Sequence, residues 1–214
     1  LAQQSQRANQ VEQLTLENER LRKLLDLRNR VSTSGIAAEV LYDAADPYTR
    51  KVILDKGMAQ GIEAGSPVID ESGVLGQVTR VMPLVAEVTL LTDRNHAIPV
   101  LNARTGARSV AYGDPASNAE PLELRFMAGN ADVQPGDLLT TSGVDGVYPP
   151  GLPVAVVERV ERRPDSAFAR ILCRPQALVE GARHVMVLKS VAGQMPPRPA
   201  PEDAPAPAPW KAKK

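Results

Sequence analysis

The fold is decided by residues 136–154, which read GDLLTTSGVDGVYPPGLPV. Apolar and β-branched residues lie at both ends of this stretch, and Gly, Ser, Asp and Pro crowd its middle. The pattern predicts two strands joined by a loop that contains Ser142. Gly136, just before the first of these strands, is expected to supply the positive φ of a tight turn.

An internal repeat surrounds this stretch. Residues 62–69 (IEAGSPVI) and 133–140 (VQPGDLLT) share an apolar residue, a Gly three positions later, and then a strand. Two further pairs of similar blocks follow in the same order. The repeat therefore predicts two related β modules. The further pairs are 73–81 with 151–160 and 87–91 with 169–173.

The whole body, from Ile36 to about Lys189, consists of short β-rich runs separated by Gly, Pro, Asp and Asn. No convincing helical stretch interrupts them, which argues against a parallel sheet with crossover helices. The fold class is mainly β, with closed or sandwiched antiparallel sheets. We place the first β module at residues 34–112 and the second at 113–190, an approximate division because strands can cross over between modules.

Residues 1–33 follow a different period. Apolar side chains from Val11 onward fit a seven-residue register, which predicts a coiled coil, and Asn18 takes an a position. A buried Asn at a is typical of parallel two-stranded coils, because two amides satisfy each other only in register. A lone amphipathic helix lying on its own domain is the alternative, since only about three heptads are present. The predicted self-association seam is Val11, Leu14, Asn18, Leu21 and Leu25.

Charge and cysteine content restrict the partners. Lys plus Arg and Asp plus Glu are both 25, so no excess positive charge attracts nucleic acid. The single cysteine, Cys173, excludes an internal disulfide and is expected to be buried in an apolar run.

The two ends of the chain carry further expectations. The chain begins at Leu1 and contains no run of 18 apolar residues, so we interpret it as a soluble piece of a longer protein. Residues 191–214 are nearly all Pro, Ala and charged residues, and they are expected to form a disordered tail.

Catalysis and metal binding find little support in the sequence. The two histidines, His96 and His184, lie far apart and show no ligand spacing, so no metal or other cofactor is predicted. A serine hydrolase using Ser142 with His96 is the alternative from a different class, although Ser142 lies in a predicted loop without an evident base. An adaptor module of another cell-envelope complex is a second alternative, but it calls for a return helix that the sequence lacks.

With these motifs the sequence resembles the MreC family of rod shape-determining proteins up to about residue 190. The resemblance rests on residues 65–69, 73–78, 90–93 and above all 136–154, and Ala155 departs from it where another Gly is expected. The family-motif turn residues are Gly65, Pro67, Gly73, Gly76, Gly136, Asp137, Ser142, Gly143, Gly146, Pro149, Gly151 and Pro153.

This resemblance implies two six-stranded β-barrels of trypsin-like architecture without catalytic residues. It also implies a non-enzymatic scaffold of the elongation machinery, a homodimer or filament that organises or activates peptidoglycan synthases. The implied location is the periplasmic side of the bacterial inner membrane, with an N-terminal transmembrane helix that this chain lacks. The implied partners are penicillin-binding protein 2, MreD, RodA and the MreB cytoskeleton.

Overall fold

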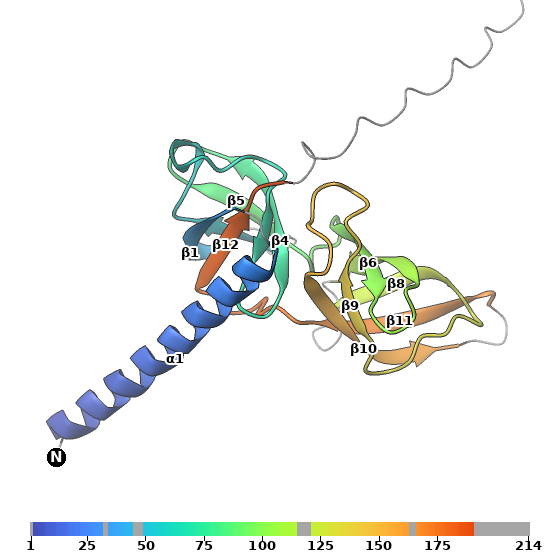
Figure 1. The fold of residues 1–214 in the computed structure, drawn as a ribbon, viewed down its shortest axis with the longest axis horizontal. Coiled ribbons are helices and arrows are strands. Elements are labelled where there is room, and N and C mark those ends of the chain that lie inside the picture. The colour runs from blue at the N-terminus through green and yellow to red at the C-terminus, as the bar shows by residue number, and fades with distance from the viewer. Residues whose placement is uncertain (1, 32–33, 45–48, 115–120, 163–165, 191–214) are drawn as a thin grey trace, which may run out of the picture.

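The computed structural model describes residues 2–31, 34–44, 49–114, 121–162 and 166–190. A long helix, α1 (Ala2–Val31), precedes two closed barrels of six strands each, and all strand pairs are antiparallel (Figure 1). The mainly β class with an N-terminal helix and two six-stranded barrels is confirmed. The expected disorder of the tail at 191–214 concerns residues outside the described part.

The first barrel has the strand order β1-β12-β3-β4-β5-β2. Between Leu54 and Pro67 the chain forms the short 3-10 helix η1 (Met58–Gln60). The strands are β1 (Gly35–Asp43), β2 (Lys51–Leu54), β3 (Pro67–Ile69), β4 (Val74–Val81), β5 (Ala86–Leu90) and β12 (His184–Leu188).

The second barrel has the strand order β10-β11-β8-β7-β6-β9 and is continuous in the chain. In β6 buried residues alternate with more exposed ones, so one face of this strand lines the barrel core. The strands are β6 (Ala97–Asn102), β7 (Arg108–Gly113), β8 (Leu122–Ala128), β9 (Leu138–Thr141), β10 (Pro153–Glu161) and β11 (Phe168–Pro175).

The division between barrels differs from the expected boundary between residues 112 and 113. Strands β6 and β7 belong to the second barrel, and the last strand, β12, returns to complete the first. The physical reason is strand pairing: β6 pairs with β9 and β7 with β8, whereas Gly35 at the start of the body lies opposite Leu188 at its end. The approximate modules 34–112 and 113–190 are corrected accordingly.

The sequence repeat corresponds to β3-β4-β5 in the first barrel and β9-β10-β11 in the second. Gly65 and Gly136 precede the first strand of each set with φ of 89° and 91°. Their N–H groups donate to the carbonyls of Val78 and Val157, each at 2.7 Å. A register shift follows each of these valines, so both barrels share a glycine turn and a bulge at matching places.

The two barrels share a buried apolar cluster, to which one face of β12 contributes. Val185 and Val187 pack in the core of the first barrel, whereas Met186 and Leu188 join a cluster that includes second-barrel residues such as Val154. All four of these side chains are buried. Burying one such side chain contributes about 1.5–3 kcal/mol, so this strand stabilises the first barrel and its contact with the second.

Helix α1 projects away from the barrels, and its C-terminal part meets the first barrel beside β12 (Figure 1). Leu24, only 4% exposed, joins the same cluster as Met186 and Leu188. Within the described residues, α1 is not apolar enough along its length to cross a bilayer.

We expect Gly73→Ala to weaken the contact between the barrels. A Cβ at Gly73, in the turn between β3 and β4, would lie 2.4 Å from the carbonyl oxygen of Pro153 in β10. The resulting shift should lower the free energy of unfolding by about 1–3 kcal/mol, measured by urea denaturation. Ser72→Ala is the matched control, and equal stability of the two variants would contradict a tight contact.

Candidate functional site

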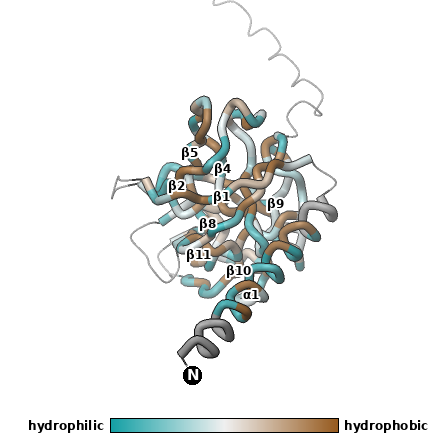
Figure 2. The backbone as a smooth tube through the Cα atoms, turned by 90° about the vertical axis from the view of Figure 1, so that its left-hand side faces the viewer, coloured by the Kyte–Doolittle hydropathy of each residue, from teal (hydrophilic) through white to brown (hydrophobic). Residues whose placement is uncertain are grey.

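The predicted seam residues lie exposed on α1. Val11 and Leu14 are each 64% exposed, and Leu25 is 48% exposed. Asn18 and Leu21 are also exposed, so the helix presents an apolar row that nothing in the described part of the chain covers. Figure 2 shows hydrophobic and hydrophilic segments alternating along the helix. The row suits pairing with a second helix, and the seam stays a prediction.

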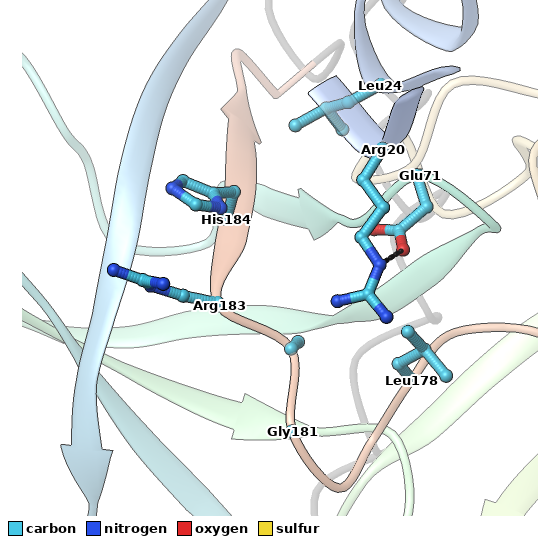
Figure 3. Close-up of a pocket in the computed structure, with 8 residues that line it drawn as sticks. Arg20, Leu24, Glu71, Leu178, Gly181, Arg183 and His184 are labelled. Atoms are coloured by element: carbon cyan, nitrogen blue, oxygen red, sulfur yellow. Dashed lines mark ion pairs between the residues drawn. The ribbon is translucent and has the colours of Figure 1, made fainter. Parts of the chain in front are cut away.

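A separate face of α1 contacts the first barrel. Leu24 packs beside β12, and Nε of Arg20 lies 3.6 Å from Oε1 of Glu71 (Figure 3). Nε2 of His184 lies 3.4 Å from a carboxylate oxygen of Glu17. The alternative of a helix lying on its own domain therefore applies only to the turns around Glu17 to Leu24. A pocket at this junction is lined by Arg20, Leu24, Glu71, Leu178, Gly181, Ala182, Arg183 and His184.

The seam and the barrel-facing residues occupy different sides of the helix. At 3.6 residues per turn, the row of Glu17, Arg20 and Leu24 lies roughly 110° around the axis from the centre of the predicted seam. Both surfaces can therefore be used at once. A second helix can pair with α1 while each copy's first barrel stays docked.

The family-motif residues shape turns and close contacts inside the barrels. Gly76 allows β5 to approach, since a Cβ there would lie 2.1 Å from the carbonyl oxygen of Thr89. Pro67 and Pro153 begin β3 and β10. Positive φ is found at Gly65, Gly136, Gly143, Gly146 and Gly151.

Asp137 organises the entrance to β9. Its carboxylate accepts hydrogen bonds from Nε of Arg104 at 2.7 Å and from Nδ2 of Asn102 at 2.8 Å. The N–H of Gln134 donates to it at 3.0 Å. The Arg104 guanidinium and these other donors hold the pKa of the Asp137 carboxyl well below its usual range, although burial acts in the opposite direction.

The loop between β9 and β10 is rigidly braced. The Thr141 hydroxyl donates to the carbonyl of Pro149 and accepts the N–H of Leu152 at 2.9 Å. The Asp145 carboxylate accepts the N–H groups of Val147 and Tyr148 at 3.1 and 3.3 Å. The motif thus specifies a fixed loop conformation.

His96 does not form a pair with Ser142. Its Nε2 is hydrogen-bonded to the Tyr148 hydroxyl at 3.0 Å, and both rings are buried. Burial lowers the pKa of His96 and raises that of Tyr148, so both are neutral near pH 7. The Ser142 hydroxyl is buried without a hydrogen-bond partner among the described residues. The Ser–His arrangement that a hydrolase requires is not formed here.

The adaptor hypothesis calls for a second helix that returns along the first. Within the part of the chain that the structure describes, α1 is the one α-helix. The same residues bring together no group of three His, Cys, Asp or Glu side chains able to hold a metal. Cys173 is buried, as its apolar neighbours in the sequence predict.

Sequence reasoning left a helix lying on its own domain as an alternative but did not identify the residues of the helix–barrel contact. Leu24 occupies a position outside the a and d seam, and its partners lie far away in the chain. The spacing of Glu17, Arg20 and Leu24 at i, i+3 and i+7 was the available signal, because such residues share one helix face. It also missed Phe126, the one non-glycine residue with positive φ in the described part.

We expect a fluorophosphonate probe to leave Ser142 unlabelled, because its hydroxyl is buried and lacks a base. Ser142→Ala should leave the melting temperature unchanged or slightly raised, since it removes an unpaired buried hydroxyl. Labelling is checked by mass spectrometry and stability by calorimetry. Specific labelling of Ser142 would overturn the non-hydrolase interpretation.

The Asp137 cluster predicts a pH dependence of stability. Because the folded-state pKa of Asp137 is depressed, its contribution is present above about pH 4 and is lost as the pH falls toward the folded value. The stability advantage of the wild type over Asp137→Asn should therefore narrow below about pH 4. Thermal melts between neutral and acidic pH measure it. Asp132→Asn, at an exposed partner of Arg104, is the control and should matter less.

Comparison with known proteins gives consistent matches. The model of the family described as "Rod shape-determining protein MreC, barrel core" matches residues 40–189. The cell shape-determining protein MreC of Haemophilus influenzae is 39% identical over 178 residues, covering 83% of this chain and 50% of that protein. The Escherichia coli K12 protein of the same name is 37% identical over 172 residues, covering 80% and 46%. The chain spans about half the length of these curated relatives.

Solved structures give the same result. The crystal structure of MreC from Pseudomonas aeruginosa superposes with a TM-score of 0.68 at 40% identity, covering 72% of this chain and 98% of that one. A chain of the complex between penicillin-binding protein PBP2 and MreC from Helicobacter pylori superposes with a TM-score of 0.55 at 14% identity, covering 73% and 99%. At that identity the second likeness shows the fold alone.

Proposed function

Since the chain belongs to the MreC family of rod shape-determining proteins, we propose that it is a non-enzymatic scaffold of the machinery that elongates the bacterial cell wall. In this function it self-associates and organises or activates peptidoglycan synthases. The observation that carries the proposal is the apolar row on α1, exposed on a helix that projects from two joined barrels.

Self-association through α1 is supported by three features. The row from Val11 to Leu25 is apolar at four of its five positions and polar at Asn18, the pattern of a parallel pair. Leu24 fixes the helix to the barrel on another side, so pairing leaves that contact intact. A coil this short is weak in dilute solution, and tethering two copies to one membrane would raise their effective concentration.

The partners follow from the family. A complex of penicillin-binding protein PBP2 with MreC is known from Helicobacter pylori, and we propose the equivalent synthase, penicillin-binding protein 2, as a partner of this chain. The resemblance also supports MreD, RodA and the MreB cytoskeleton as partners. It further supports a periplasmic location of the barrels, held at the inner membrane through an N-terminal helix.

Leu14→Glu is expected to abolish self-association, because it places charge in the seam. Leu16→Glu is a matched control, since Leu16 is an exposed leucine of the same helix outside the predicted seam. Sedimentation equilibrium over a wide concentration range should show a monomer for the first variant and wild-type association for the second. Equal self-association of the two variants would contradict the assignment of Leu14 to the seam.

Asn18→Leu should loosen the preference for a dimer, because the buried amide pair that restricts the coil to two strands is lost. The same sedimentation experiment should then show higher oligomers beside the dimer. An unchanged stoichiometry would count against placing Asn18 in the seam.

A further inference from the structure

Two carboxylates converge on one histidine where α1 meets the first barrel. Nε2 of His184 in β12 lies 3.4 Å from Oε1 of Glu17 in α1 and 3.4 Å from Oε1 of Glu39 in β1. Even a protonated imidazole carries one positive charge against these two negative ones, and Nε2 has at most one hydrogen to donate. The junction therefore holds more negative charge than His184 compensates.

No lysine or arginine of the same copy pairs with either carboxylate within the part of the chain that the structure describes. Arg20 pairs instead with Glu71, with 3.6 Å between Nε and Oε1. Arg183 lines the junction pocket but forms no ion pair with Glu17 or Glu39 (Figure 3). Because the Glu17 side chain is 35% exposed, a cation from another molecule can reach it.

The heptad register supplies such a cation from a paired helix. With Asn18 at a, Glu17 takes a g position and Arg22 takes the following e position. In a parallel two-stranded coil, a g side chain of one helix faces the following e side chain of the other. Arg22 is exposed and forms no ion pair among the described residues. It is therefore available to a second copy.

The two charged residues lie on opposite flanks of the seam, roughly 140° apart around the helix axis. The Glu17 flank also carries Leu24, which is buried against the first barrel. A helix paired through the seam thus brings its Arg22 flank next to the barrel of the other copy. The preceding g and e residues, Gln10 and Thr15, are neutral, so charge recognition falls on Glu17 and Arg22.

We infer that Arg22 of a second copy binds the Glu17 carboxylate at the junction of α1 with the first barrel. The inference rests on the proposed self-association through α1 and names the contact that orients it. Two-fold symmetry forms the contact twice, once at each first barrel. A guanidinium offers five N–H donors in a rigid plane, which suits a junction with two carboxylates.

Arg22→Glu tests the contact, because it replaces two attractive pairs in each dimer with two repulsive ones. The dissociation constant of the dimer should rise by about tenfold or more, measured by sedimentation equilibrium in about 0.1 M salt. Lys23→Glu is the matched control, since it makes the same charge change at an exposed f position. The difference between these two variants should shrink in about 1 M salt, which screens exposed charges.

Exchanging the two charges should restore pairing. The double variant Arg22→Glu with Glu17→Arg rebuilds the pair with opposite polarity. An equimolar mixture of the two single variants rebuilds it between unlike chains. Both samples should return to within about threefold of the wild-type dissociation constant. The apolar contact of Leu24 remains in every variant, and calorimetric melting temperatures check that the barrels stay folded.

Wild-type association of Arg22→Glu would overturn the inference and leave the seam standing. An antiparallel pair gives that result, because it sets e against e and exchanges one like-charge contact for another. Equal weakening by Arg22→Glu and Lys23→Glu, or a charge exchange that does not restore pairing, would also overturn it. A wild-type chain that stays monomeric at every concentration would refute self-association itself, and this contact with it.

Discussion

The structure depends on the two-sided burial of β12. Its valines fill the first barrel, and Met186 and Leu188 belong to a buried cluster that also contains Leu24 of α1 and residues of the second barrel. Side chains from three parts of the molecule are therefore connected in one buried cluster, to which this strand of five residues contributes. Side chains packed at the density of a crystal resist displacement, so the barrels and the base of the helix behave as one body. Such a body suits the proposed scaffold, because a flexible joint would lose the orientation between bound partners.

The helix complements this body by carrying two separate surfaces. One side is fixed through Leu24, the ion pair of Arg20 with Glu71 and the contact of Glu17 with His184, and the other presents the apolar row. These partly exposed polar contacts are individually weak, so the apolar contact of Leu24 is the main anchor. If two copies pair through α1, their first barrels are therefore held in a defined orientation relative to each other.

The features that the sequence predicted correctly are those that depend on residues close together in the chain. The β class, the repeat and its glycine turns follow from local patterns, and Gly65 and Gly136 adopt the expected conformation. The assignment of β6, β7 and β12 to barrels was not accessible, because it depends on the long-range pairings of β6 with β9, β7 with β8 and β12 with β1. The buried contact of Leu24 and the positive φ of Phe126 were not predicted for a related reason. Each depends on a neighbour or a bulge that only the tertiary structure supplies.

The late position of β12 also dictates an order of folding. The second barrel is built from consecutive strands and can close as soon as β11 has emerged, whereas the first must wait for its final strand. Until then the pairing edges of β1 and β3 stay open, and closing so long a loop adds an entropic barrier. A nascent chain is thus open to aggregation through these strand edges until nearly its entire length has been made, so a chaperone would protect the first barrel more than the second.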